Sequence, residues 1–162
     1  MKFKLITVFA AALLLAACSS SEDVATTDAS GSSSTDSSGA SAVAPGTVED
    51  FQVNVGDRVF FDYDSFEIRA DAQDTLQKQA AWLQQYPTYT VTVEGHCDER
   101  GTREYNLALG ERRANSVKNY LIALGIDGNR VQTISYGKER PESAGSDETA
   151  WALNRRGVTV LQ

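Results

Sequence analysis

His96, Cys97 and Asp98 stand next to one another in a charged turn bracketed by Gly95 and Gly101. A cysteine beside a histidine can form a nucleophile pair, and histidine with aspartate can bind a metal ion. Neighbouring side chains at the end of a strand point to opposite sides, however, so they do not readily converge on one reacting atom. The chain has one histidine, which leaves a zinc site short of its usual ligands. The spacing therefore predicts neither catalysis nor a metal site, and Cys97 is better explained as a small packing residue.

Recognition of a charged ligand fits the same turn better. In a helix that follows it, Asn106, Leu109 and Arg113 share one face, because positions three and four apart are neighbours. If this helix packs beside the end of the preceding strand, Asp98 lies next to that face. An acid and an arginine in one shallow site suit a zwitterion, whose ammonium goes to Asp98 and whose carboxylate goes to the fork of Arg113. A structural salt bridge between the two, or two solvated charges, is the alternative, and spacing alone does not favour the binding site over it.

The elements that would position these residues alternate between strands and helices. The predicted order is a strand at Val59–Phe61, a helix from about Ala72 to Tyr86 stopped by Pro87, a strand at Thr90–Glu94, a helix from about Glu104 to Leu124, a strand at Val131–Ser135, a loop over Gly137–Asp147, a short helix at Glu148–Asn154 and a strand at Gly157–Leu161. This βαβαβαβ order predicts an α/β (α+β) two-layer sandwich in which helices cover a sheet.

The first residues predict export and a lipid anchor. Residues 1–17 combine two lysines with a short apolar run, which is typical of a secretory signal peptide. Leu15 to Cys18 resembles the lipobox of bacterial lipoproteins, which implies cleavage before Cys18 and covalent lipid on it; an ordinary cut near Ala17 that leaves a soluble periplasmic protein is the alternative. Ser19 favours the outer membrane, with the domain facing the periplasm. A lipidated Cys18 cannot form a disulfide, so Cys97 is expected to be unpaired.

Residues 18–50 are expected to form a disordered tether, and residues 51–162 one domain. The tether is rich in Ser, Ala and acid and has no Lys, Arg or aromatic residue after Cys18, so it cannot bury enough apolar surface to fold. The remaining length is that of a single domain with one core. The chain carries a formal net charge of −7, and we expect no nucleic-acid partner.

Three motifs resemble one known family. They are GHCDERGTREYNLALGERRAN, SYGKERP and NRRGVTV, and they look like the OmpA-like C-terminal domain, most of all its peptidoglycan-associated lipoprotein branch. The resemblance implies a mixed four-stranded sheet with helices packed on it. It also implies non-covalent binding of peptidoglycan through the meso-diaminopimelate of the stem peptide, with no catalysis and no cofactor apart from lipid on Cys18. Tol system proteins, especially TolB, and a role in envelope integrity and cell division are further implications.

The resemblance also assigns roles to individual residues. Asp98 matches the acid that receives the diaminopimelate amine, and Arg113 matches the arginine that receives its carboxylate. Further ligand contacts are implied for Tyr63, Asp64, Arg100 and Leu109, and supporting roles for Asn106, Asn154, Arg155 and Arg156. Family members often carry Thr or Ala at the position of Cys97, a small change that should leave binding intact.

Two rival functions are distinguishable from this one. A flagellar-stator-like wall anchor would share the binding domain but would have a spanning helix, which the lipobox argues against. A hydrolase of wall peptides would need a nucleophile pair or a metal cluster, and the sequence offers neither in a convincing arrangement.

Overall fold

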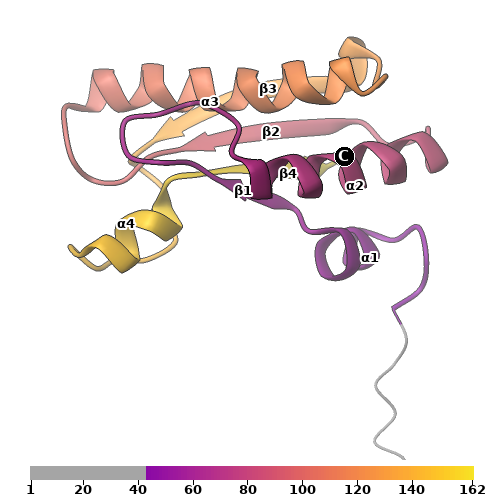
Figure 1. Ribbon diagram of the computed structural model, residues 1–162, viewed down its shortest axis with the longest axis horizontal. Helices are drawn as coiled ribbons and strands as arrows, with labels where there is room; N and C mark the ends of the chain where they lie inside the picture. The colour runs from indigo at the N-terminus through magenta and orange to yellow at the C-terminus, as the bar shows by residue number, and fades with distance from the viewer. Residues whose placement is uncertain (1–42) are drawn as a thin grey trace, which may run out of the picture. The chain divides into compact units, whose positions relative to one another are not determined.

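The computed structural model describes residues 43–162, which contain one mixed sheet (Figure 1). Its strands are β1 Arg58–Phe60, β2 Val91–His96, β3 Val131–Gly137 and β4 Arg156–Leu161. They lie in the order β1-β4-β2-β3; β2 and β3 run parallel, and β4 is antiparallel to both β1 and β2. The predicted α+β architecture with a mixed four-stranded sheet is therefore confirmed.

The long helices α2, Ala70–Gln85, and α3, Arg103–Ala123, cover one face of this sheet (Figure 1). A three-residue helix α1, Val48–Asp50, runs directly into a π-helical turn, Phe51–Val55. A 3-10 turn, Gly128–Arg130, leads into β3, and the short helix α4, Glu148–Asn154, precedes β4. Within residues 43–162 no helix is long and apolar enough to cross a membrane.

Local sequence signals explain where the helices near the pocket begin and end. The hydroxyl of Thr102 accepts a hydrogen bond from the backbone N–H of Tyr105 and so caps α3. The Asp147 carboxylate does the same for α4 through Ala150 N–H. At the other end of α3 the chain turns at Gly125, whose φ of +96° is accessible to glycine at little cost. The predicted bounds of both helices differ from the observed ones by at most one residue.

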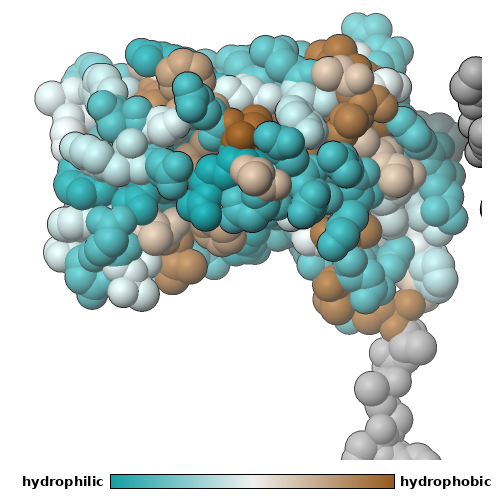
Figure 2. Space-filling model, viewed as in Figure 1, coloured by the Kyte–Doolittle hydropathy of each residue, from teal (hydrophilic) through white to brown (hydrophobic). Residues whose placement is uncertain are grey.

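The core lies between the sheet and α2 and α3. Its largest fully buried apolar side chains come from the π-helical turn, the loop after β1, both long helices and the strands β2 and β3: Phe51, Phe61, Leu76, Leu83, Leu121, Val91, Val93, Val117 and Val131. One buried polar contact is satisfied inside it, because the hydroxyl of Thr159 on β4 donates to Gln79 Oε1 on α2 at 2.9 Å. Figure 2 shows a largely hydrophilic outer face, with apolar residues near α1, where Val48 and Val53 are exposed.

The predicted boundary between tether and domain was wrong by several residues. Asp50 was assigned to the tether, yet its carboxylate accepts hydrogen bonds from Trp82 Nε1 at 2.8 Å and from Gly46 N at 2.9 Å. The Tyr89 hydroxyl also donates to Gly46 O. The composition of residues 43–50 gave no sign of this, because the order comes from a few contacts to distant aromatic residues. Residues 1–17, Cys18 and the first part of the predicted tether lie outside the described residues.

Two glycines bring α3 unusually close to β2. A Cβ atom built on Gly95 would stand 1.8 Å from the carbonyl oxygen of Gly110, and one on Gly110 would stand 2.9 Å from Gly95 O. Backbone therefore packs directly against backbone where β2 approaches its end. This contact sets the distance between the turn after β2 and the face of α3 that carries Leu109 and Arg113.

Gly95→Ala tests this contact. The new methyl group can be accommodated only if α3 moves away from β2. We therefore expect the free energy of unfolding to fall by at least about 1–3 kcal/mol. Urea denaturation measures it. Gly128→Ala is the matched control, since its Cβ would meet only the tip of Ile122, at 3.2 Å. Equal stability of the two variants would contradict the packing role of Gly95.

The side chain of His96 lies on the side of β2 opposite Gly95, and it is the backbone carbonyl of His96, not the side chain, that contacts α3 through Arg113. Its side chain is 2% exposed, stacks near Tyr136, and neither ring nitrogen has a hydrogen-bond partner among the described residues. Burial, followed by the positive charge of Arg156, lowers the pKa of His96 to about 4. The Glu94 carboxylate, 3.4 Å from Nε2, favours the imidazolium but is partly exposed and does not outweigh these effects.

The stability of the domain should consequently fall between pH 6.5 and pH 4. In this window the unfolded chain binds a proton at His96 and the folded chain does not, so protonation favours unfolding by about 3 kcal/mol at the acid end. Urea denaturation at pH 7.5 and pH 4.5 measures the change. His96→Gln should remove most of the pH dependence in this window, whatever its effect on absolute stability. A pH dependence equal to that of the unaltered domain would contradict a neutral buried His96.

Candidate functional site

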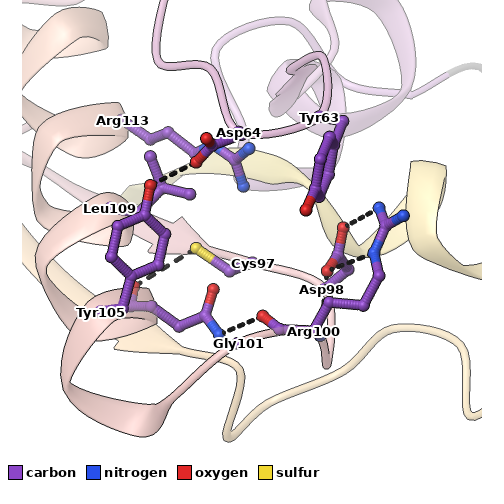
Figure 3. A pocket seen from close by; sticks show the side chains of 10 residues that line it. Tyr63, Asp64, Cys97, Asp98, Arg100, Gly101, Tyr105, Leu109 and Arg113 are labelled. Carbon is purple, nitrogen blue, oxygen red and sulfur yellow. Dashed lines mark hydrogen bonds and ion pairs between the residues drawn. The ribbon is translucent and has the colours of Figure 1, made fainter.

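The predicted site residues meet in one pocket of about 350 Å³ at the end of β2 (Figure 3). Its walls come from the loop after β1, the turn after β2 and the first turns of α3. The lining residues are Tyr63, Asp64, Cys97, Asp98, Arg100, Gly101, Tyr105, Asn106, Leu109 and Arg113. All six residues predicted to contact a ligand are among them, although they come from three separate segments of the chain.

Asp98 is an almost fully enclosed carboxylate with four hydrogen bonds. Oδ1 accepts from Arg100 N and Nε, both at 3.1 Å, and Oδ2 accepts from Arg100 Nη2 at 2.6 Å and Arg155 Nη1 at 3.4 Å. Burial alone would raise the pKa of Asp98, but the hydrogen bonds from Arg100 outweigh it and hold the pKa below its usual value. Asp98 is therefore ionised at neutral pH.

The guanidinium of Arg100 lies between two aromatic rings. Its central carbon is 4.1 Å from the ring centroid of Tyr63 and 4.0 Å from that of Trp151. A cation over an aromatic face is attracted by the negative face of the ring. Arg100 thus has its place fixed by two rings and by its paired bonds to Asp98, with the three contacts coming from different parts of the fold.

Arg113 is buried at the floor of the pocket and is tied to backbone, not to an acid. Nε donates to Ser65 O at 2.8 Å, Nη1 to His96 O at 2.8 Å and Nη2 to Asp62 O at 3.0 Å. Among the described residues Asp98 forms no salt bridge with Arg113. It pairs with Arg100 and Arg155 instead. Burial lowers the pKa of Arg113, but an arginine side chain stays protonated in proteins. Each terminal nitrogen makes one of these backbone bonds, and the Cys97 thiol is a further neighbour of the guanidinium.

Asp64 has an unusual backbone conformation. Its φ is +53°, which among residues 43–162 is the one positive value outside glycine. Aspartate tolerates this region better than most residues, and strained backbone often marks functional sites. The Tyr105 hydroxyl donates to Asp64 Oδ1, which links the loop after β1 to α3 across the pocket (Figure 3). Asp64 forms no ion pair within the described part of the chain.

Cys97 and Leu109 form the apolar part of the pocket wall. Cys97 is 3% exposed and forms no disulfide within residues 43–162, and its thiol donates to Asn106 O. Burial raises the pKa of Cys97 to about 11, so the thiol is a poor nucleophile. Strand alternation separates His96 from Cys97, as predicted, but both Cys97 and Asp98 line the pocket because β2 ends at His96. Within residues 43–162 no group of three His, Cys, Asp or Glu residues could hold a metal ion.

The predicted supporting residues divide between the pocket and a neighbouring loop. Asn106 donates to Arg100 O at 2.7 Å and so fixes the turn, and Arg155 donates to Asp98 and to Phe61 O. Asn154 instead accepts from Glu142 N and Ser143 N. Arg156 is buried, pairs with Glu142 at 3.3 Å and donates to Arg140 O, so it braces the loop before α4 and does not border the pocket.

Sequence reasoning missed Tyr105 and Trp151. Tyr105 is the residue before Asn106 and stands one turn before Leu109, so helical spacing could have placed it near the pocket. Trp151 could not be found in this way, because nothing in the short segment of α4 indicates that it reaches the turn after β2. Its neighbour Glu148 was missed for the same reason; it binds Arg155 Nη2 at 2.6 Å and lies 3.9 Å from Arg100 Nη1.

Comparison with known proteins gives consistent results. The model of the OmpA family matches residues 60–155. The chain is 62% identical over 123 residues to the peptidoglycan-associated lipoprotein of Rhizobium meliloti, a match that covers 76% of this chain and 70% of the relative. It is 46% identical over 112 residues to the protein of the same name from Pasteurella multocida, covering 69% and 74% of the two chains. These names are those of a lipoprotein and not of an enzyme, in line with the prediction of a non-catalytic protein.

Solved structures agree with the family match. The crystal structure of the peptidoglycan-associated lipoprotein from Burkholderia pseudomallei superposes with a TM-score of 0.64 at 42% identity, covering 65% of this chain and 90% of the other. The C-terminal domain of Helicobacter pylori MotB gives a TM-score of 0.61 at 23% identity, over 65% and 84% of the two chains, which shows a shared fold alone. On the family match and on its identity with these relatives, the chain belongs to the OmpA family.

Proposed function

We propose that this chain is an outer-membrane lipoprotein whose domain binds peptidoglycan non-covalently and so anchors the outer membrane to the cell wall. The ligand is the meso-diaminopimelate of the stem peptide, whose side chain ends in an ammonium and a carboxylate on one carbon. The observation that carries this proposal is a single pocket lined by two acids and two arginines, Asp64, Asp98, Arg100 and Arg113. Formal charges of opposite sign cancel within it, which suits a zwitterion better than a simple anion or cation. The names of the relatives support the wall as the partner.

Each charged group of the ligand has an oppositely charged side chain to bind in this pocket. The carboxylate goes to Arg113, whose remaining N–H groups on Nη1 and Nη2 can donate to two oxygens. The ammonium goes to Asp98, with Asp64 on the opposite wall as a second negative charge. Leu109 packs against the methylene chain between the peptide backbone and the zwitterionic end.

Binding needs a local opening of the pocket. Arg113 has no exposed surface, so a carboxylate reaches it only after side chains above it move. Tyr105 is 44% exposed, and its ring is the large side chain of the lining best able to turn aside. Because the site is small and must open, affinity for one stem peptide is modest. An anchor on Cys18 keeps the domain near the wall polymer and raises the effective concentration.

Calorimetric titration of residues 43–162 tests the assignment. A stem peptide with meso-diaminopimelate should bind, and the same peptide with lysine should bind at least tenfold more weakly, because lysine keeps the amine and lacks the carboxylate. Asp98→Asn and Arg113→Lys should each weaken binding of the diaminopimelate peptide by tenfold or more. The first removes the negative charge of the clamp, and the second keeps the positive charge but removes the two-pronged guanidinium donor.

The matched control is Arg112→Ala, an exposed arginine beside Arg113 that does not border the pocket. It should bind like the unaltered domain. Equal binding of both peptides, or unchanged binding by folded Asp98→Asn and Arg113→Lys, would contradict the zwitterion clamp. Release of soluble fragments from purified wall would instead favour a hydrolase.

The family resemblance further supports a place in the Tol system, with TolB as a protein partner and a role in cell division. We expect purified TolB to bind residues 43–162 in a surface-based binding assay. An unrelated periplasmic protein of similar charge serves as the control. Failure of TolB to bind would remove this partner and leave the proposal of wall binding in place.

A further inference from the structure

Trp151 contacts Arg100, a residue of the pocket lining, but does not line the pocket itself. Its ring centroid lies 4.0 Å from the central guanidinium carbon of Arg100, which also lies 4.1 Å from the ring centroid of Tyr63. Its Nε1 donates to Glu99 Oε1 at 3.1 Å, which fixes the plane of the ring. Helix α4 therefore holds one face of Arg100 from a segment about fifty residues further along the chain.

Asp98 has no free acceptor position in its plane, and this creates a requirement for ligand binding. Its two oxygens accept four hydrogen bonds, three of them from Arg100 and one from Arg155. Arg155 is 6% exposed and is held by Phe61 O and Glu148. Arg100 is the more exposed partner, with 30% of its side chain open to solvent. An ammonium that binds Asp98 must accordingly take the place of one bond from Arg100.

We propose that Trp151 is a positioning residue for the diaminopimelate site. Together with Tyr63 it keeps Arg100 at the pocket wall while Asp98 exchanges a bond to Arg100 for one to the ligand ammonium. Glu148, 3.9 Å from Arg100 Nη1, is the acid nearest to take up the freed guanidinium N–H. The inference rests on the proposed function, because the exchange occurs only if the ligand carries an ammonium group.

Trp151→Leu tests the inference by titration with the same diaminopimelate peptide. Loss of the aromatic face should weaken binding about three- to tenfold, which is the range of a single cation–π contact. Trp151→Phe should recover most of the affinity, because it keeps a ring without the indole N–H. In an Arg100→Ala background the change from Trp151 to Leu should have no further effect, since its only action is through Arg100.

Leu153→Ala is the matched control, because Leu153 is a large exposed residue of the same helix that lies outside the pocket lining. It should leave binding unchanged. An affinity for Trp151→Leu equal to that of the unaltered domain would overturn the inference, and so would an equal loss with and without Arg100. Urea denaturation of each variant separates a loss of binding from a loss of folding.

A measurement without ligand keeps the two proposals separable. Ring currents from Tyr63 and Trp151 should shift the Arg100 Nε–H proton resonance upfield in the NMR spectrum, and Trp151→Leu should reduce that shift. A domain that shows the shift but binds no peptide overturns the proposed function, and the role of Trp151 in binding with it. A domain that binds the peptide but lacks the shift overturns the positioning role alone.

Discussion

The pocket depends on the buried guanidinium of Arg113. A charged group without solvent contact must be compensated by protein dipoles, and here three backbone carbonyls supply them: Asp62 O and Ser65 O after β1, and His96 O at the end of β2. One side chain of α3 therefore ties together the three segments that form the pocket walls. The loop that carries Tyr63 and Asp64 lies between two of its carbonyl contacts, which gives a physical reason for the left-handed backbone at Asp64.

This arrangement requires α3 to lie very close to β2. The direct packing of Gly95 against Gly110 provides the closeness one turn away from Arg113. A larger side chain at either position would separate the helix from the strand end and draw the guanidinium away from His96 O. The two glycines and the arginine thus together fix the position of α3 against the end of β2. They do so through backbone contacts and not through contacts between their side chains.

The sequence was sufficient for the fold and for most of the pocket. Periodicity placed α3 and α4 to within one residue, and in the structure each helix follows a residue whose side chain caps it. The spacing of Asn106, Leu109 and Arg113 correctly predicted a shared face. The sequence could not predict three contacts that are set by tertiary packing: Asp50 bound to Trp82, Asp98 held by Arg100 and not by Arg113, and Trp151 stacked on Arg100. The first and the third join segments far apart in the chain, for which local spacing carries no signal. The second is a local pair, and its preference over Arg113 depends on how the turn after β2 folds.

The two arginines of the pocket solve different physical problems. Arg113 is compensated by neutral carbonyls, so its formal charge remains available to an incoming carboxylate. Arg100 is compensated by a full negative charge on Asp98 and by two aromatic faces, so the same bonds that stabilise Asp98 also occupy it. The proposed zwitterion would therefore meet a positive group that no acid neutralises and a negative group that Arg100 already occupies. In the proposed binding mode, selectivity for a ligand with both charges would follow from this difference: the carboxylate would bring the ligand to Arg113, and a cation beside it would then compete with Arg100 for Asp98.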